Sequence, residues 1–236
     1  MKELKGKVAY ITGGSKGIGY GIAEVLLQQG MKVAISGRHR ADLEKAVKAL
    51  GSSNVFPLVS DVSRAADEKA AVQKIVGKWG QLDVVVANAG VGHFAPVDQL
   101  EEEAWNQMIN TNLSGVFHTL KAALPPLKDS KGYYITIASL AGTNFFPTAA
   151  GYNATKFGVV GFTQAAMLDL RPHGIKVSTI MPGSVASHFN DHVPSEEDAW
   201  KIQPEDIGTL VLDLLKMHPR TLPSKIEVRP TRPDLK

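Results

Sequence analysis

Seven short apolar or β-branched runs alternate with longer segments of helical periodicity, and this alternation restricts the possible folds more than any other feature of the chain. The runs are KVAYIT, KVAISG, NVFPLVS, LDVVVAN, YYITIAS, KVSTIM and KIEVRP. Several are apolar on both faces, which is typical of parallel strands covered by helices on both sides. Helices are expected between them, at about 17–29, 41–50, 65–79, 101–124, 151–171 and 204–215. We therefore predict one doubly wound α/β domain over residues 1–236, with a seven-stranded parallel sheet flanked by helices.

The composition agrees with one globular domain and excludes several other classes. Hydrophobic residues make up 44% of the 236 residues and charged residues 21%, which is too apolar for a disordered chain. Without cysteine, neither a disulfide framework nor a thiolate metal site can form. The net charge of +3 is spread along the chain, so no nucleic-acid partner is expected. A start without an apolar leader and the absence of any long apolar run predict a cytoplasmic protein with no membrane partner.

Glycines cluster where the first strand meets the first helix, in TGGSKGIG at residues 12–19. A helix that begins there would direct free N–H groups and the positive end of its dipole at a pyrophosphate, and glycines would let the backbone come close. The alternative is a tight turn that uses glycine only for positive φ and close packing. The place of the turn at the head of an α/β chain favours a dinucleotide site and a Rossmann fold.

Charged residues near this turn favour NADP(H) over NAD. An NAD enzyme would place an acidic residue about 20 residues after the glycines. Here the second run ends in ISGRHR, with Arg38 and Arg40 and no carboxylate nearby, and Lys16 lies inside the turn. Arginine grips a phosphate through a bidentate fork. We predict that Lys16 and Arg38 hold the 2′-phosphate, and we interpret His39 and Arg40 as surface residues that start the next helix.

Tyr152 and Lys156 lie four residues apart in an expected helix, so their side chains share one face. A tyrosine hydroxyl has a pKa near ~10. A nearby ammonium, together with the positive charge of an oxidised nicotinamide, would favour the phenolate and make the group a proton donor and acceptor nearer neutrality. Ser139 ends the fifth run and so faces the same crevice, although a serine there is also a common turn residue.

The glycine turn and the YNATK segment at 152–156 together resemble the short-chain dehydrogenase/reductase family, and the likeness extends from about residue 7 to about 187. The resemblance implies a catalytic tetrad of Asn112, Ser139, Tyr152 and Lys156. Tyr152 would be the general acid toward a carbonyl and the base in reverse, and Ser139 would bond the substrate oxygen. Lys156 would lower the tyrosine pKa and bind the nicotinamide ribose, while Asn112 would anchor a water that relays protons.

The same resemblance assigns residues to the cofactor. They are Gly13, Ser15, Lys16, Gly17, Ile18, Gly19, Arg38, Asp61, Val62, Asn88, Ala89, Gly90, Tyr152, Lys156, Pro182, Gly183, Val185 and Ser187. Asp61 and Val62 would border the adenine, and residues 88–90 would lie under its ribose. Asp61 could instead cap the helix that follows. Pro182 and Gly183 match the segment beside the nicotinamide, with Ser187 in place of a frequent threonine.

The later part of the chain departs from the family. The segment that closes over the substrate in this family is short in this chain, at residues 188–203. This predicts a short lid and an open pocket. The chain ends in a proline-broken basic tail without the family's glycine-rich closing segment. A homo-oligomer, dimer or tetramer, is expected, and a dimer would form through the helices at 101–124 and 151–171. The seven histidines lack the H-E-x-x-H spacing, so no metal site is predicted.

These features predict an NADPH-dependent enzyme that reversibly reduces a small-molecule ketone, aldehyde or 3-oxoacyl group to an alcohol. Among named activities, 3-oxoacyl-carrier-protein reductases resemble it most, although nothing in the chain marks an acyl-carrier partner. One alternative is a redox-sensing NADP-binding protein without turnover, against which the intact tetrad argues; another is a flavin carrier. Phe94, Phe145, Phe146 and Phe189 indicate an apolar or aromatic ketone, and core packing explains some of them equally well.

Overall fold

The computed structural model describes residues 3–232, in which seven parallel strands form one sheet in the order β3-β2-β1-β4-β5-β6-β7. The strands are β1 (Val8–Thr12), β2 (Lys32–Gly37), β3 (Val55–Val59), β4 (Val84–Ala87), β5 (Tyr133–Ile137), β6 (Lys176–Pro182) and β7 (Lys225–Val228). Each predicted run forms a strand, so the predicted doubly wound sheet is confirmed. The ends of the predicted domain, residues 1–2 and 233–236 with the last part of the basic tail, lie outside the described residues.

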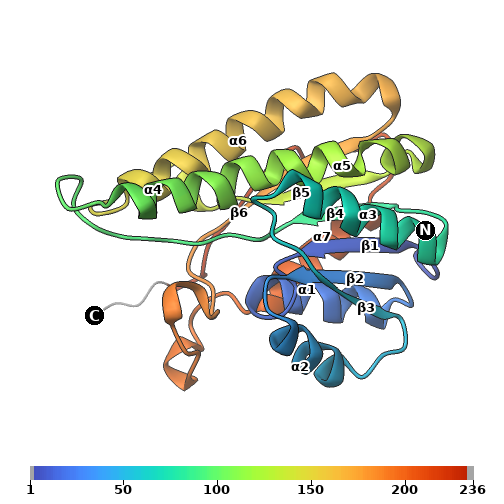
Figure 1. The fold of residues 1–236 in the computed structure, drawn as a ribbon, viewed down its shortest axis with the longest axis horizontal. Helices are drawn as coiled ribbons and strands as arrows, with labels where there is room; N and C mark the ends of the chain where they lie inside the picture. The colour runs from blue at the N-terminus through green and yellow to red at the C-terminus, as the bar shows by residue number, and fades with distance from the viewer. Residues whose placement is uncertain (1–2, 233–236) are drawn as a thin grey trace.

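Helices cover both faces of the sheet (Figure 1). One layer holds α1 (Gly17–Gln28), α2 (Arg40–Leu50) and α7 (Pro204–Lys216), and the other holds α3 (Ala65–Trp79), α5 (Gly115–Ser130) and α6 (Ala150–Leu170). Strand β1 shows why its run is apolar throughout. Ala9 and Ile11 enter the core under α1, whereas Val8 and Tyr10 enter the core under α5, because alternate side chains of a strand point to opposite faces.

The single helix expected at 101–124 has a different course in the structure. Helix α4 (Glu102–Met108) passes into a π-helical segment, Ile109–Ser114, and continues as α5 through two prolines to Ser130. A proline removes an N–H donor and usually ends a helix. Here tertiary contacts hold the last turn, because Leu127 is buried and the Ser130 hydroxyl donates to the Leu82 carbonyl at 2.8 Å.

The carboxyl ends of β1 and β4 are joined by side-chain hydrogen bonds in the middle of the sheet. Thr12 Oγ1 accepts from the N–H groups of Asn88 and Ala89, both at 3.0 Å. The Asn88 amide donates in turn to the carbonyls of Thr12 and Gly13, at 2.9 and 3.1 Å. From β1 the strand order continues through β2 and β3 toward one edge of the sheet, and from β4 it continues through β5 and β6 toward the other edge. The gap between β1 and β4 is therefore the topological switch point, where ligands of open α/β sheets bind.

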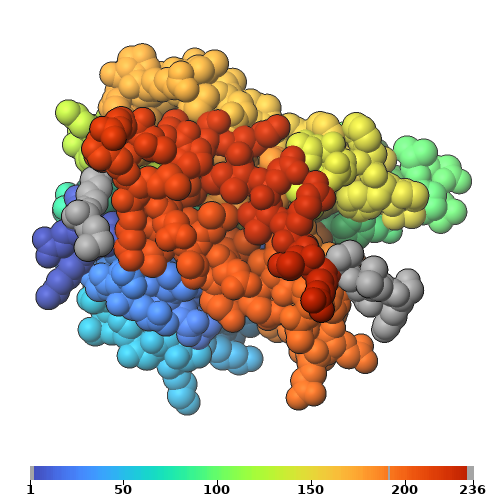
Figure 2. Space-filling model, turned by 180° about the vertical axis from the view of Figure 1, so that it is seen from behind, coloured from blue at the N-terminus to red at the C-terminus, as the bar shows by residue number. Residues whose placement is uncertain are grey.

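Helix α7 packs closely on α1, and the C-terminal elements extend across that face of the molecule (Figure 2). A Cβ atom at Gly21 of α1 would lie 2.5 Å from the carbonyl carbon of Pro204, so a glycine is required there. In both views residues 188–203 project beyond the layers (Figure 1, Figure 2). Among residues 3–232, no helix is long and apolar enough to cross a membrane.

Candidate functional site

The predicted site residues gather at one edge of the sheet. The seven parallel strands end there, and predicted residues follow six of them within two positions: β1 is followed by the glycine turn, β2 by Arg38, β3 by 61–62, β4 by 88–90, β5 by Ser139 and β6 by 183–187. Asn112, Tyr152 and Lys156 join this edge from the π-helical segment and α6. The parallel topology therefore brings together segments that lie far apart in the sequence.

The glycine turn has the properties of both alternatives that the sequence left open, a tight packed turn and a phosphate-binding helix start. Gly13 and Gly17 have φ angles of +64° and +56°, where a side chain is strained. A Cβ atom at Gly19 would lie 2.5 Å from the Gly13 carbonyl oxygen and 2.6 Å from Asn88 Nδ2, so packing within the protein already excludes it. The residue before α1, Lys16, makes no side-chain cap. The first N–H groups of α1 are thus suited to hold a pyrophosphate.

The segments that carry Lys16 and Arg38 lie next to each other at the ends of β1 and β2. A Cβ atom at Gly37 would lie 3.6 Å from Ser15 Oγ, so the residues that precede the two cations are neighbours. Both cations are exposed, and within residues 3–232 neither forms an ion pair with a carboxylate. Arg40 is exposed at the first position of α2, as its interpretation as a surface residue requires. This charge arrangement fits a phosphate group between Lys16 and Arg38.

Asp61 shapes the turn between β3 and α3 and does not cap the helix. Its Oδ1 atom accepts from the backbone N–H and the hydroxyl of Ser63, at 2.9 and 2.7 Å. The residue before α3 is Arg64, which makes no side-chain cap. Val62, the next residue of the predicted pair, is buried, and a Cβ atom at Gly115 would lie 2.7 Å from its Cγ2 atom.

Sequence reasoning missed Glu68, a fully buried carboxyl group beneath this turn. Its Oε1 atom accepts from the hydroxyls of Ser60 and Tyr10, at 2.7 and 2.9 Å, and its Oε2 atom accepts from Thr119 at 2.9 Å. Burial raises the pKa of Glu68, and the three hydroxyl donors oppose that rise. Its spacing could have revealed it, because position 68 shares one helix face with the buried residues at 71, 72 and 75.

Tyr152 and Lys156 lie side by side on α6 and are 8% and 5% exposed. Lys156 Nζ donates to the Ile137 carbonyl at 3.1 Å and lies 5.6 Å from the centre of the Tyr152 ring. Ser139 follows the same strand, and its Oγ atom accepts from the Ala141 N–H at 3.1 Å. The end of β5 therefore positions both the lysine and the serine beside the tyrosine.

Burial dominates the protonation of this pair. Burial raises the pKa of Tyr152 to about 12, although a hydrogen bond with the Ser139 side chain lowers that pKa in part. It also lowers the pKa of Lys156 to about 8. The sequence-based prediction of a tyrosine pKa closer to neutrality included the charge of an oxidised nicotinamide and stays a prediction; in the protein alone, burial outweighs the ammonium. At pH 7 Tyr152 is accordingly protonated, the state from which it can donate.

Asn112 is 1% exposed in the π-helical segment, and its whole amide group is used. Its Oδ1 atom accepts from the Val91 N–H at 2.8 Å, and its Nδ2 atom donates to the Val91 carbonyl at 2.9 Å and to Thr155 Oγ1 at 3.1 Å. A Cβ atom at Gly90 would lie 3.3 Å from Asn112 Oδ1 and 3.7 Å from Lys156 Nζ. The residue thus fixes the chain after β4 against α6, and such π-helical segments are frequent at functional sites.

Asn153 is a second positioning residue that sequence reasoning missed. Its buried amide donates to the carbonyls of Ala141 and Asn144, at 2.6 and 2.7 Å, and so holds the chain after Ser139 against α6. Asparagine is unfavourable inside a helix, because it competes for backbone hydrogen bonds. Its occurrence in the middle of YNATK was the signal that could have found it.

The segment after β6 returns to the glycine turn. Gly183 N–H donates to the Val228 carbonyl at 2.8 Å, and Val185 pairs with Ile202 across the ends of the 188–203 segment. A Cβ atom at Gly17 would lie 3.2 Å from the Cβ atom of Ser187. Two predicted cofactor segments, 13–19 and 182–187, are therefore in contact.

The 188–203 segment is organised by one buried carboxylate. Asp198 is 4% exposed, pairs with His192 Nε2 at 2.6 Å and Lys201 Nζ at 2.5 Å, and accepts from the Ser195 N–H at 3.0 Å. The Lys201 and His192 partners hold the pKa of Asp198 well below its usual range. The segment forms two short 3₁₀ turns, Phe189–Asp191 and Glu196–Asp198, in place of a long helix.

The chain matches known proteins over nearly its whole length. The family model described as short chain dehydrogenase matches residues 7–198. A Staphylococcus saprophyticus protein named an uncharacterized oxidoreductase is 33% identical over 238 residues, which cover 98% of this chain and 100% of that protein.

Solved structures give the same assignment. An alcohol dehydrogenase from the archaeon Thermococcus sibiricus, complexed with 5-hydroxy-NADP, is 32% identical with a TM-score of 0.90 and covers 98% of this chain and 100% of its own. A 3-ketoacyl-(acyl-carrier-protein) reductase from Brucella melitensis, complexed with NADH, is 28% identical with a TM-score of 0.89 and covers 97% of this chain and 99% of its own. With the family model over most of the chain and this fold, the protein belongs to the short-chain dehydrogenase/reductase family of oxidoreductases.

Proposed function

We propose that this protein reduces a ketone, aldehyde or 3-oxoacyl carbonyl to an alcohol with NADPH, and catalyses the reverse reaction. One observation carries the proposal: the buried pair of Tyr152 and Lys156 lies beside Ser139, at the sheet edge that also carries the glycine turn. A tyrosine kept protonated next to a buried ammonium is suited to give a proton to a carbonyl oxygen and to be stabilised afterwards as a phenolate.

Each group of the tetrad has a proposed task. When bound, NADPH supplies the hydride that reduces the carbonyl carbon. Tyr152 donates its proton to the carbonyl oxygen, and the Ser139 hydroxyl bonds the same oxygen as charge develops there. Lys156 stabilises the phenolate that remains and binds ribose hydroxyls of the cofactor. Asn112 holds the chain between β4 and α4 in place, and we keep its water-relay role as a proposal from the family resemblance.

The preference for NADP(H) is supported by the charges at the ends of β1 and β2. Lys16 and Arg38 are exposed, and the segments that carry them are neighbours. Within residues 3–232, neither forms an ion pair with a carboxylate. The Thermococcus sibiricus structure holds 5-hydroxy-NADP, whereas the Brucella melitensis structure holds NADH. Relatives thus occur with either kind of nicotinamide cofactor, and the two cations favour the phosphorylated one.

We also propose that two copies of the chain pair through α5 and α6. The support is a set of large apolar side chains that these helices leave exposed: Phe117 at 48%, Phe157 at 36% and Leu168 at 57%. Phe157 and Leu168 are eleven residues apart, which places them on one face of α6. The ring of Phe117 lies 6.2 Å from that of Phe162, which joins the two helices into one surface.

The test of the enzymatic proposal is loss of NADPH absorbance with a panel of ketones, aldehydes, diketones and 3-oxoacyl thioesters. We expect turnover by the wild-type protein and a decrease of roughly 100-fold or more in kcat for Tyr152→Phe, because a general acid contributes at least that much. NADPH binding, measured by fluorescence, should persist in the variant. If every carbonyl is inert while NADPH still binds, the reductase proposal is wrong and a redox-sensing role takes its place.

A further inference from the structure

Three phenylalanine rings from three different loops gather beside Tyr152, two of them against its ring and the third against Phe94. Phe94 follows β4, Phe146 precedes α6, and Phe189 belongs to the first turn of the 188–203 segment. The ring centres of Phe94 and Phe189 lie 5.4 and 5.5 Å from that of Tyr152, and both Phe146 and Phe189 lie 6.3 Å from Phe94. We call Phe94, Phe146 and Phe189 the aromatic cluster.

The aromatic cluster is not part of the hydrophobic core. Phe94 and Phe189 are each 37% exposed and Phe146 is 44% exposed, so core packing does not account for them. The backbone below is adapted to their rings: a Cβ atom at Gly92 would lie 3.0 Å from Phe94 Cε2 and would collide with the ring of Phe189. The protein therefore keeps a half-exposed apolar surface beside Tyr152, the side chain that we propose protonates a carbonyl.

From this geometry we propose that the substrate is an uncharged carbonyl compound with an aryl substituent that packs into the aromatic cluster. This inference rests on the proposed reductase function and names its substrate class. The cluster rings meet at angles of 32° to 74°, the tilted and edge arrangements that aromatic groups prefer, and a substrate ring extends the same pattern. In the described part of the chain, the lysines that lie over aromatic rings lie over rings other than the three of the cluster, so the cluster itself presents apolar ring surfaces.

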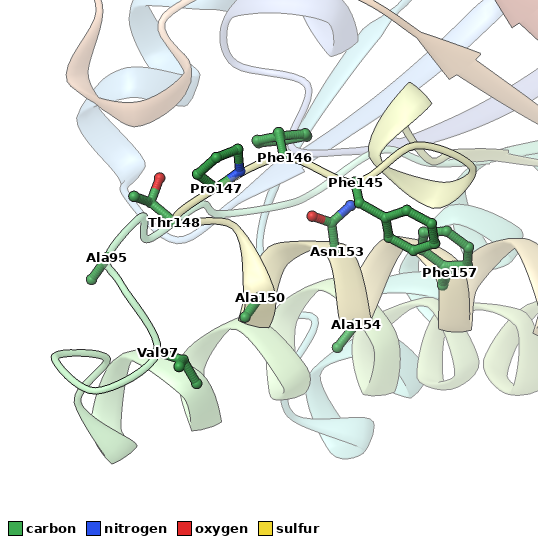
Figure 3. A pocket seen from close by; sticks show the side chains of 10 residues that line it. All are labelled: Ala95, Val97, Phe145, Phe146, Pro147, Thr148, Ala150, Asn153, Ala154 and Phe157. Carbon is green, nitrogen blue, oxygen red and sulfur yellow. The ribbon is translucent and has the colours of Figure 1, made fainter.

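Phe145 provides a matched control from the same loop. It is 81% exposed, and its ring stacks on Phe157 of α6 at 5.0 Å with an interplanar angle of 6°. Figure 3 shows Phe145 and Phe146 pointing in different directions, Phe145 toward Phe157 and Phe146 away from it. Phe145 and Phe146 both line a groove of about 550 Å³, to which Tyr152, Phe94 and Phe189 do not contribute. Replacing Phe145 removes an equal ring without touching the aromatic cluster.

The test compares 4-phenylbutan-2-one with 4-cyclohexylbutan-2-one, whose rings lie too far from the carbonyl to change its reactivity, and with butan-2-one. In the wild-type protein we expect kcat/KM for the phenyl ketone to exceed that for the cyclohexyl ketone by about 2–10-fold. Phe94→Leu and Phe146→Leu should bring this ratio close to one, and kcat/KM for butan-2-one measures any change in activity that all three ketones share. Phe145→Leu should keep the wild-type ratio, and unchanged melting temperatures would show that all variants are folded.

The outcomes separate this inference from the proposed function. Equal kcat/KM for the two ring-bearing ketones, or loss of the ratio in Phe145→Leu as well, overturns the aryl assignment while the reductase stands. If no ketone is reduced, the reductase proposal fails. Calorimetry with Tyr152→Phe loaded with NADPH then decides the aryl assignment without turnover: tighter binding of the phenyl ketone supports it, and equal or absent binding overturns it.

Discussion

Lys156 places an ammonium group inside the folded protein, and this position opposes stability. Burial lowers its pKa to about 8, from an ordinary value of 10.5. A shift of that size corresponds to roughly 3 kcal/mol of unfavourable free energy while the side chain stays charged. We expect Lys156→Met to raise the melting temperature at pH 7 by roughly 6–12 °C and to abolish reductase activity. Lys128→Met, at an exposed lysine of α5, is the control.

The gain from Lys156→Met should depend on pH in a defined direction. Below pH 8 the folded wild-type protein holds a charged Lys156, so Lys156→Met has its full stabilising effect there. Between pH 8 and 10.5 the folded protein releases the proton while the unfolded chain keeps it, so wild-type stability recovers and the gain shrinks. Calorimetry at several pH values from 6.5 to 10 would measure this, and a gain that does not change with pH would contradict the assignment.

Arg38 and Lys16 determine, in our proposal, which nicotinamide cofactor is preferred. Hydrogen bonds to a charged group contribute about 1.5–3 kcal/mol each, so Arg38→Ala should raise KM for NADPH by roughly 10–100-fold. KM for NADH should hardly change, since that cofactor lacks the 2′-phosphate. Arg40→Ala removes an exposed arginine at the start of α2 and should leave both values unchanged. A similar loss for both cofactors in Arg38→Ala would show that the side chain does not contact the 2′-phosphate.

At the level of elements, the 188–203 segment depends on Asp198 more than on regular secondary structure. The carboxylate is held by Lys201, His192 and the Ser195 N–H, and its depressed pKa keeps it ionised at neutral pH. We expect Asp198→Asn to accelerate amide hydrogen exchange across 188–203 while the rest of the chain keeps its protection. Glu197→Gln changes an exposed carboxylate of the same turn and should have no such effect.

The pH dependence of this segment follows from the same carboxylate. Because the pKa of Asp198 is depressed in the folded protein, its contribution is present at neutral pH and is lost as the pH falls through the ordinary aspartate range and below. Exchange in 188–203 should therefore accelerate at acid pH in the wild type and be less sensitive in Asp198→Asn. If the protection of residues 188–203 against exchange does not depend on pH in either protein, the backbone turns alone hold the segment.

The elements that sequence could predict are those determined by local pattern. The five inner strands were visible as apolar runs, because two helical layers require both of their faces to be apolar, whereas the edge strands β3 and β7 are only partly buried. The π-helical segment at Ile109–Ser114 was not visible, since the Asn112 amide is bonded to Val91 and Thr155, 21 and 43 residues away. The turns of α5 beyond Leu124 likewise depend on a distant partner, Leu82.

The site shows the same division. Its loop residues could be predicted, because they follow strand ends whose positions the pattern determines. Tyr152 and Lys156 were predicted from their spacing in a helix, and Asn112 from the family resemblance. The state of those residues could not, because burial raises the pKa of Tyr152, and burial is a property of the assembled fold. The buried Glu68 and Asn153 were missed for a related reason: their partners belong to other elements.

For the whole molecule, the outer surface of α5 and α6 is the proposed contact between two copies, and Figure 1 shows the two helices running alongside each other on one side of the sheet. Fully burying a large apolar side chain contributes about 1.5–3 kcal/mol, so covering Phe117, Phe157 and Leu168 in both copies would provide a substantial driving force. We therefore expect analytical ultracentrifugation at micromolar concentration to give twice the mass of the chain.

A charge introduced within the α5 and α6 surface should dissociate the proposed dimer. Phe157→Glu would bury a carboxylate against the partner, a cost that an apolar interface cannot offset, and we expect it to sediment as a monomer. Val59→Glu introduces the same charge at another exposed apolar residue, 50% exposed at the end of edge strand β3, and should remain a dimer. Dissociation in both variants would place the contact elsewhere, and a wild-type protein that sediments only as a monomer would remove the proposed pairing altogether.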